Sequence, residues 1–482
     1  MRTGAEYRES RRDGRQVWLL GEKIDDVTRH PATAPVVDAY AQWYDWHHDP
    51  AWQDVLLTPP DARGERPPIA FEIPRTPQDI RALGESVHAL AFPHAGYITH
   101  TPGYGAVIFL AVMDTICSFG PAERGQAARA YWDWLAREQV HLVAPFATPS
   151  TDRARPPAEQ LAPRVVKETD GGVVVSGSLG MATSMCYADV AYVGVLRPAG
   201  LPEQAIWCAI PVNAPGVKIF ARKPAARVDD PFLYPLSTRY DELDCGFRMD
   251  DVFVPWEHVF LYRDVEFFNR FGFRNLNWLQ YFHLARMLAW ADFSLGLALA
   301  VTELQTTAAA QESVDALTDL IFHVETQRTA FRAAAFDAEY SPLGHAMPGQ
   351  MDVTVGMTYA LQHRAEIAHT VRLLAGHQAM LAPALEDLAA AELGAAIAPG
   401  YESAGVSARQ RAALMHLIAD HTTSALEGRQ IAFEGLATGG LRTWRLKART
   451  LFQRQADLVN GVLAVLDAAD RPDVAVKPFA PR

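Results

Sequence analysis

The sequence is poor in cysteine and has no short cysteine motif. Its 482 residues include four cysteines, and no two of them form a Cys-x-x-Cys pair. This spacing excludes a zinc ribbon and a disulfide framework, so we expect reduced thiols in a cytoplasmic protein. The first residues, MRTGAEYRESRRDGRQVW, are charged and lack the apolar stretch of a secretory signal, so no export is expected.

Positive charge is also scarce. Lys and Arg number 44 against 56 Asp and Glu, which gives a net charge of −12. Such a surface is not built to neutralise phosphates, so we expect neither nucleic acid nor an anionic membrane as a partner. The longest apolar stretch, residues 284–301, contains Arg286 and Asp292. Two charges in one helix favour a buried helix of a soluble protein over a membrane span.

Several catalytic and nucleotide-binding motifs are missing. There is no GxxxxGK[ST] loop, no GxGxxG after a strand, no GxSxG elbow and no HExxH. The pairs His363/His369 and His416/His421 are six and five residues apart, which does not place two imidazoles on one helix face. We therefore interpret the histidines as structural or surface residues and expect no metal.

The chain divides into three regions of different pattern. Residues 1–139 are expected to be α-helical, with Thr76 as a cap before Pro77 and helical spacing over 107–119 and 127–135. Residues 140–270 contain short β-rich runs over 164–175, 189–195, 205–212, 216–219 and 246–254. Residues 271–482 return to long helical segments, broken near 341–342 and 398–400. The pattern predicts an α+β protein with an N-terminal helical domain, a central β-domain and a C-terminal helical bundle with a tail.

Aromatic residues are dense where the β-region meets the bundle, from Phe267 to Phe282. We interpret this cluster as a domain interface or core, although flat ligands also bind at such junctions.

Runs along the whole chain resemble the oxygenase component of 4-hydroxyphenylacetate 3-monooxygenase. They are MRTGAEY at the start, GEKIDDVT at 21–28, RARPP at 153–157, PFLYPLSTR at 231–239, DDVFVPWE at 250–257 and GRQ at 428–430. The resemblance implies an acyl-CoA-dehydrogenase-like fold with a four-helix bundle. It also implies reduced FAD (FADH2) supplied by a separate flavin reductase, O2 as co-substrate, and a homotetramer.

The resemblance also points to a substrate site. The family's Arg-Ser-Pro-Asp-Tyr segment matches residues 100–104, so Tyr104 is kept and His100 replaces the arginine. The family histidine that bonds the substrate hydroxyl falls on Ala144, and His141 lies three residues earlier. His141 either serves in its place or is a structural histidine. The implied catalytic residues are Tyr104, His100 and His141, and the loop over the substrate includes Leu196 and Arg197.

The flavin side of the site is implied in the same way. The implied cofactor contacts are Ala144, Pro145, Phe146, Ser150, Thr151, Asp152, Arg153, Thr183, Ser184, Gly440, Leu441, Arg442 and Thr443. We expect an FADH2-dependent monooxygenase that hydroxylates a phenol-like substrate through a flavin C4a-hydroperoxide, which must be kept from water. The alternatives are a flavoenzyme that oxidises a nitrogen centre or dehydrogenates its substrate, and an inactive flavin-binding scaffold.

Overall fold

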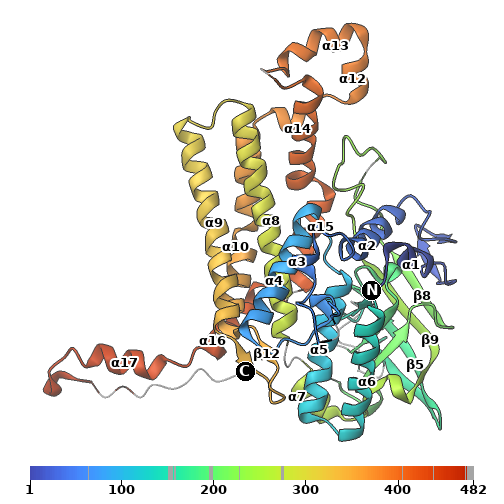
Figure 1. Ribbon diagram of the computed structural model, residues 1–482. Helices are drawn as coiled ribbons and strands as arrows, with labels where there is room; N and C mark the ends of the chain where they lie inside the picture. Colours follow the sequence, from blue (N-terminus) through green and yellow to red (C-terminus); the bar gives the residue numbers. More distant parts are fainter. Residues whose placement is uncertain are drawn as a thin grey trace.

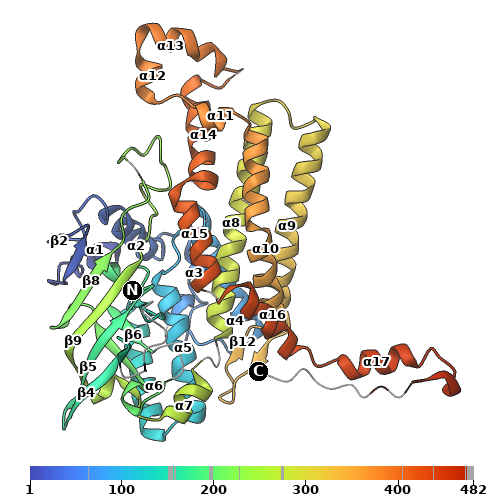
Figure 2. The same cartoon turned by 180° about the vertical axis from the view of Figure 1, so that it is seen from behind.

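The computed structural model describes residues 1–62, 64–149, 156, 159–194, 199–226, 228–272, 276–403, 405–437, 439–472 and 474. Figures 1 and 2 show a helical N-terminal region and a β-domain side by side, with a tall helical bundle beside them. The three-part organisation expected from the sequence is therefore present.

Among the described residues, the N-terminal region has six α-helices. They are α1 (Gly4–Glu9), α2 (Ala34–Trp46), α3 (Gln53–Leu56), α4 (Pro77–Ala91), α5 (Pro102–Phe119) and α6 (Ala122–Glu138). The expected cap of α4 is present, because the Thr76 hydroxyl accepts from the Asp79 backbone N–H in a capping box and Pro77 occupies the first turn. Helix α5 is buried along most of its length, as its uniformly apolar sequence requires.

The first region is not purely helical, which corrects the expectation for residues 1–139. Strands β1 (Val17–Leu19) and β2 (Glu22–Ile24) form a hairpin, and β1 pairs in parallel with β8 (Val217–Ala221) of the central domain. Strands this short carry little periodicity, and the pairing partner lies about 200 residues further along the chain.

Two sheets form the central domain. The larger has the order β2-β1-β8-β9-β5-β4, and the smaller has the order β10-β7-β6-β3. The remaining bounds are β3 (Leu142–Val143), β4 (Arg164–Thr169), β5 (Gly172–Leu179), β6 (Val190–Val193), β7 (Ile206–Pro211), β9 (Cys245–Pro255) and β10 (Val259–Tyr262). All five expected β-rich runs lie on or across these strands.

The C-terminal bundle is built on three long helices, α8 (Asn277–Leu304), α9 (Gln311–Phe336) and α10 (Gln350–Ala375), with α14 (Ala408–Thr423) and α15 (Ala425–Ala437) beside them. Helix α7 (Val265–Phe271) precedes the bundle and β11 (Glu339–Tyr340) pairs with β12 (Ala346–Met347) between α9 and α10. Short helices α11 (Gln378–Leu381), α12 (Leu385–Ala389) and α13 (Ala391–Ile397) form a projection. Helix α16 (Gly440–Leu451) leads to α17 (Gln455–Leu463), which extends away from the body in both views (Figures 1 and 2).

Helices α5 and α8 are the two that are long and apolar enough to cross a membrane, among the residues described. Both are core helices here, since 83% and 67% of their most apolar windows are buried inside the protein. Arg286 and Asp292 of α8 are paired in place. Arg286 forms a buried ion pair with Glu434, and Asp292 accepts from His88 and Arg328. This pairing is what allows charged residues inside a core helix.

Candidate active site

The amino end of α5 places His100 and Tyr104 next to each other. Thr101 is extended and Pro102 begins the helix, so Tyr104 lies on its first turn. The ring centroids of His100 and Tyr104 are 4.2 Å apart, and both side chains are buried. Gly105 allows this helix end to lie close to Leu142, because a Cβ at position 105 would lie 2.1 Å from the Leu142 carbonyl oxygen. Helix α5 can therefore rest directly on β3.

A buried carboxylate, Glu242, anchors the segment before α5. Its Oε1 accepts from the backbone N–H groups of Thr99 and His100 at 2.7 and 2.9 Å and from the Tyr40 hydroxyl at 2.5 Å. Its Oε2 accepts from the Thr99 hydroxyl at 2.5 Å. Burial alone would raise the pKa of Glu242, but hydrogen bonding from His100 and the charge of Arg429 lower it to about 2. Glu242 is thus an ionised, acceptor-only group.

This carboxylate determines the tautomer of His100. Because the Thr99 hydroxyl donates its proton to Glu242, its oxygen must accept from His100 Nδ1, which lies 2.6 Å away. His100 therefore carries its proton on Nδ1 and has a lone pair on Nε2. Burial lowers the pKa of His100, so the neutral imidazole is the resting form.

Aromatic rings from two bundle helices complete the walls around these side chains. Phe282 and His283 of α8 lie with their centroids 5.7 and 5.5 Å from the Tyr104 ring, and Phe433 of α15 lies 5.5 Å from His100. Burial lowers the pKa of His283 to about 3, with the nearby Arg286 charge acting in the same direction. The walls are therefore apolar or neutral.

The cations near these walls are paired with acids. Arg286 is engaged by Glu434 and by the Gly96 carbonyl oxygen. Arg429 donates to both oxygens of Asp244, which also accepts from Arg222. No positive charge of the described residues is thus left over beside His100 and Tyr104.

Thr183 belongs to a polar cluster next to this wall. Its hydroxyl donates to Asp244 at 2.7 Å, and Arg429 lies over the Phe433 ring at 4.7 Å. Thr183 occupies a turn between Met181 and Ser184, two non-glycine residues with left-handed backbone angles of 50° and 65°. Such strained turns concentrate at ligand sites. The Ser184 hydroxyl instead points inward to Tyr40, at 2.6 Å.

The segment after β3 contains the other residues that are expected to contact the flavin. Ala144 and Pro145 are buried, and Phe146 is half-buried. The nearby Thr148 hydroxyl is buried without a hydrogen-bond partner among the described residues. A buried unpaired hydroxyl next to this segment fits a bound ligand with polar edges, as a flavin has. Ser150, Thr151, Asp152, Arg153, Leu196 and Arg197 lie outside the described residues.

Two further predicted contacts lie apart from the His100 side chain. His141 is fully buried, and its Nε2 lies 2.7 Å from the backbone oxygen of His100 while its Nδ1 lies 3.3 Å from the Tyr7 hydroxyl. Both of its ring nitrogens thus face protein groups. Helix α16 begins at Gly440 with a positive φ of 68°, and its first turn continues with Leu441, Arg442 and Thr443. In the described structure these residues have no hydrogen bond or ring contact to His100 or Tyr104.

Sequence reasoning missed Glu242, Asp244, His283, Arg429 and Phe433. Arg429 lies in the GRQ run that carried the resemblance, and His283 follows the aromatic cluster that we interpreted as an interface. The signal for Glu242 and Asp244 was a run of three acids in four positions, 241–244, directly before β9.

Solved structures show first what class of fold this is. The chain aligns with the butyryl-CoA dehydrogenase of Megasphaera elsdenii over 77% of its length, at a TM-score of 0.52 and 15% identity, a likeness of fold alone. The expected acyl-CoA-dehydrogenase-like fold is thereby confirmed. A crystal structure of the oxygenase component (HpaB) of 4-hydroxyphenylacetate 3-monooxygenase complexed with FAD is much more similar, with a TM-score of 0.90, 27% identity and coverage of 97% of this chain and 99% of that one.

The family follows from the sequence comparisons. Residues 3–261 match the 4-hydroxyphenylacetate 3-hydroxylase N-terminal family, and residues 265–458 match its C-terminal family. The oxygenase component of 4-nitrophenol 4-monooxygenase/4-nitrocatechol 2-monooxygenase of Rhodococcus opacus is 30% identical over 99% of this chain and 93% of its own length. The FADH2-dependent monooxygenase TftD of Burkholderia cepacia is 30% identical over 90% of this chain and 86% of its own. The chain belongs to the 4-hydroxyphenylacetate 3-hydroxylase family, and it is a flavin-dependent monooxygenase that uses reduced FAD.

Proposed function

We propose that this chain is the oxygenase component of a two-component system that hydroxylates a phenol without a carboxylate. The observation that carries the proposal is the pairing of Tyr104 with a neutral His100 inside an aromatic enclosure. A phenol fits such a site because its ring packs against Phe282 and Phe433 while its hydroxyl meets both polar groups.

In this proposal His100 acts as the general base. Its Nε2 lone pair accepts the phenol proton, and the Nδ1–H remains on the Thr99 hydroxyl. The imidazolium that results is stabilised by the ionised Glu242, whose Oε2 lies 3.7 Å from Nδ1. Proton removal makes the phenol oxygen electron-rich, which activates the ring carbon beside it.

Tyr104 and His141 have supporting roles in the same proposal. The Tyr104 hydroxyl donates to the substrate oxygen and stabilises the charge that develops there. Burial raises the pKa of Tyr104, so it stays a donor throughout the working pH range. His141 acts as a positioning residue through its hydrogen bond to the His100 backbone oxygen.

Reduced FAD supplies the activation and transfer of oxygen. Ala144, Pro145 and Phe146 on one side, and Thr183 with Arg429 on the other, are the described residues that would hold it. The paired Asp244 and Arg429 keep this side fixed, while the buried aromatic walls exclude water from the reacting atoms.

The substrate class follows from the charges. A substrate carboxylate needs a cation to offset its desolvation, and the cations beside the site are already paired. A phenol without a carboxylate, such as the 4-nitrophenol named for the Rhodococcus opacus relative, is therefore favoured over 4-hydroxyphenylacetate.

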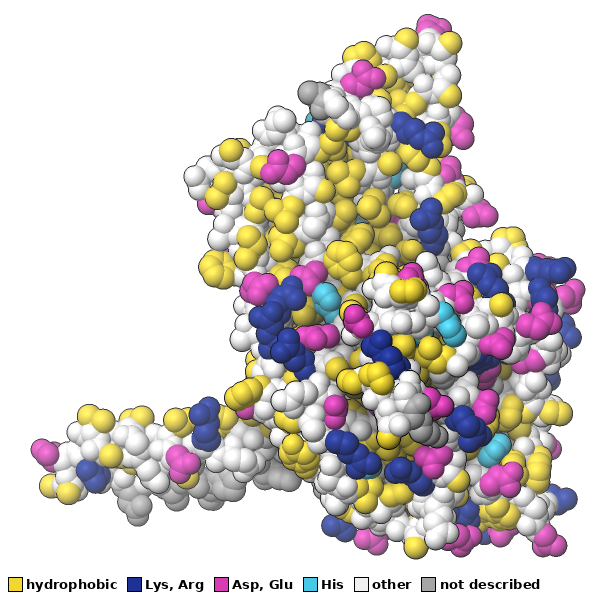
Figure 3. Space-filling model, viewed as in Figure 1, with side chains coloured by type: hydrophobic (Ala, Val, Ile, Leu, Met, Phe, Trp, Pro, Cys, Tyr) yellow, Lys and Arg dark blue, Asp and Glu magenta, His cyan; other side chains and the backbone are white. Residues whose placement is uncertain are grey.

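We also propose a separate flavin reductase, a cytoplasmic location and a homotetramer. The oxygenase-component names of the relatives support the reductase. Figure 3 displays apolar side chains over the upper part of the bundle. The exposed apolar residues of α8 and α9 include Leu299, Val314, Ile321 and Phe322. Helix α17, with exposed Leu458 and Val462, extends from the body, so both surfaces support contacts between copies of the chain. Light scattering that gives a monomer of 53.1 kDa would contradict the assembly.

The experiment is an anaerobic titration with reduced FAD, followed by an oxygen pulse with 4-nitrophenol, 4-hydroxyphenylacetate or no phenol. We expect tighter binding of reduced than oxidised FAD and hydroxylated product from 4-nitrophenol. With 4-hydroxyphenylacetate we expect most of the flavin to be consumed as hydrogen peroxide. Tightly coupled hydroxylation of 4-hydroxyphenylacetate would overturn the substrate class, and oxidation of substrate without oxygen incorporation would indicate a dehydrogenase. Absence of flavin binding would indicate an inactive scaffold.

A further inference from the structure

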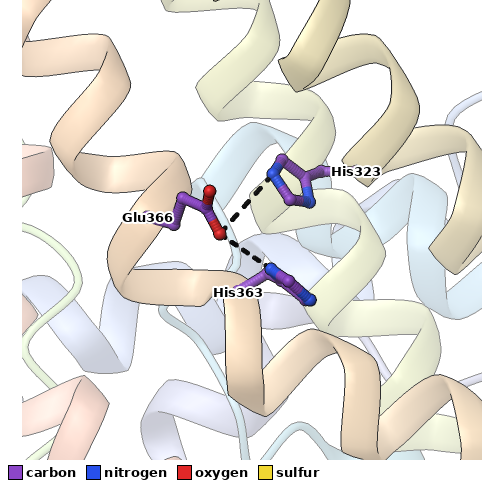
Figure 4. Close-up of side chains that lie close together, drawn as sticks. All are labelled: His323, His363 and Glu366. Atoms are coloured by element: carbon purple, nitrogen blue, oxygen red, sulfur yellow. Dashed lines mark hydrogen bonds and ion pairs between the residues drawn. The ribbon is translucent and has the colours of Figure 1, made fainter.

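Two histidines and a glutamate meet on the outer side of the bundle, on α9 and α10. His323 comes from α9, and His363 and Glu366 come from α10, so 40 residues separate the two histidines in sequence (Figure 4). One nitrogen of each ring and a carboxylate oxygen all lie within 4.8 Å of one another. Glu366 Oε2 lies between the rings, 2.8 Å from His363 Nδ1 and 3.7 Å from His323 Nε2.

We propose that these three side chains bind a divalent transition-metal ion. In a tetrahedral zinc site, bond lengths of about 2.0–2.2 Å put ligand atoms roughly 3.3–3.5 Å apart. The distances from Glu366 Oε2 to the two ring nitrogens, 2.8 and 3.7 Å, lie on either side of this ligand-to-ligand separation. To bind an ion, the two imidazole rings must approach each other. The side chains of His363 and Glu366 are 30% and 59% exposed, so they can rotate to do so, and the open side leaves room for a water ligand.

A neighbouring tyrosine orients the most buried of the three ligands. The Tyr359 hydroxyl lies 3.0 Å from His323 Nδ1. When Nδ1–H donates to this hydroxyl, the lone pair of Nε2 points at Glu366. Metal-bound histidines commonly have such a partner on the other ring nitrogen, and it fixes both tautomer and ring orientation.

The donor set also indicates the class of ion. Two imidazole nitrogens and one carboxylate oxygen suit Zn²⁺, Co²⁺, Ni²⁺ and Cu²⁺, whereas Mg²⁺ and Ca²⁺ prefer oxygen ligands alone. The Asp319 carboxylate acts electrostatically on the His323 ring, and its charge favours a cation. A metal here joins two long bundle helices and takes no part in the flavin reaction.

The test uses the full chain without an affinity tag. Zn²⁺ is titrated calorimetrically, and Co²⁺ is added while its visible spectrum is recorded, since tetrahedral coordination gives a distinct absorbance. We expect one high-affinity ion per chain and an increase in Tm with excess Zn²⁺ but not with Mg²⁺. His323→Ala, His363→Ala and Glu366→Gln should each remove this binding and the Tm increase, while Tyr359→Phe should weaken binding roughly 10- to 100-fold.

His369→Ala is the matched control, because His369 is an exposed histidine on the same helix. It should leave the titration, the Co²⁺ spectrum and the hydroxylation activity unchanged. The proposal is overturned if the wild-type chain takes up no ion, if His323→Ala and His363→Ala titrate like wild type, or if His369→Ala weakens binding as much as they do.

Discussion

Glu242→Gln is the substitution that most directly tests the proposed base. Glutamine keeps the shape of the side chain and can present its carbonyl oxygen at the Oε1 position, where it still accepts from Tyr40 and from the backbone N–H groups of Thr99 and His100. The amide NH2 then occupies the Oε2 position and donates to the Thr99 hydroxyl. That hydroxyl must in turn donate to His100 Nδ1.

The consequence is a reversed tautomer of His100. With Nδ1 as acceptor, the ring carries its proton on Nε2 and presents a donor to the phenol in place of a lone pair. A correctly placed general base contributes about 10²–10⁴-fold to a rate, so we expect hydroxylation to fall by at least about 10²-fold. The lost charge also weakens hydrogen bonds worth about 1.5–3 kcal/mol each, which lowers the free energy of unfolding by a similar amount.

The assay is a single turnover in which enzyme with reduced FAD is mixed with O2 and phenol, and product is counted per flavin oxidised. Flavin affinity and Tm are measured alongside. Thr99→Ser is the control, because serine retains the hydroxyl that links Glu242 to His100 by hydrogen bonds. We expect Glu242→Gln to bind reduced FAD nearly normally while it diverts most of the flavin to hydrogen peroxide. A Glu242→Gln enzyme with wild-type coupling and an unchanged pH profile would refute the assignment of His100 as the base. An equal loss of FAD binding would indicate that Glu242 only supports the fold.

Two other predictions concern the hydroxyl donor and the buried histidines. Tyr104→Phe should weaken phenol binding roughly 10- to 100-fold, which corresponds to about 1–3 kcal/mol for an unpaired buried partner. It should leave the affinity for reduced FAD unchanged. Equal phenol affinity of the variant and the wild type in an equilibrium titration would show that the phenol hydroxyl binds elsewhere. Burial lowers the folded-state pKa of His94 to about 4 and that of His283 to about 3, so the unfolded chain binds their protons first. His94 and His283 contribute their full stability above about pH 6.5. This stability is lost as the pH falls through about 4 to 3, and the loss is roughly 1.4 kcal/mol per pH unit for each residue. Urea unfolding should therefore show a lower midpoint at pH 5.5 than at pH 7, and His94→Asn should reduce that difference; equal midpoints would contradict the linkage.

Local signals predicted the elements that depend on local sequence. Thr76 as a cap and Pro77 in the first turn predict α4. The apolar run after Tyr104 predicts a buried α5, because this helix has no polar face for solvent. The hairpin of β1 and β2 carries no such signal, since three-residue strands obtain their stability from β8. The resemblance found His100 and Tyr104 because they lie in one short segment with a family pattern.

The rest of the candidate site depends on contacts between distant segments. In the sequence Glu242 is one acid among three, and only the fold brings it to Thr99 and His100, which lie 143 and 142 residues earlier. The sequence also does not predict that His323 and His363 lie close together, because helix spacing predicts only which residues of one helix share a face. Such residues become identifiable only when the packing of helix against helix, or loop against loop, is known.

The replacement of an arginine by His100 is consistent with the charges around it. A permanently charged guanidinium attracts anionic ligands at every pH, whereas a buried neutral imidazole selects for groups that can give up a proton. Because Arg286 and Arg429 are each held by an acid, the enclosure offers a substrate one lone pair and one hydroxyl in an apolar surrounding. A ligand without a hydroxyl leaves both of these groups desolvated and unpaired, and sites of this kind discriminate strongly against it. In the proposed mechanism, recognition of the aromatic hydroxyl and its activation depend on the same two side chains, and Glu242 controls both by fixing which nitrogen of His100 is free.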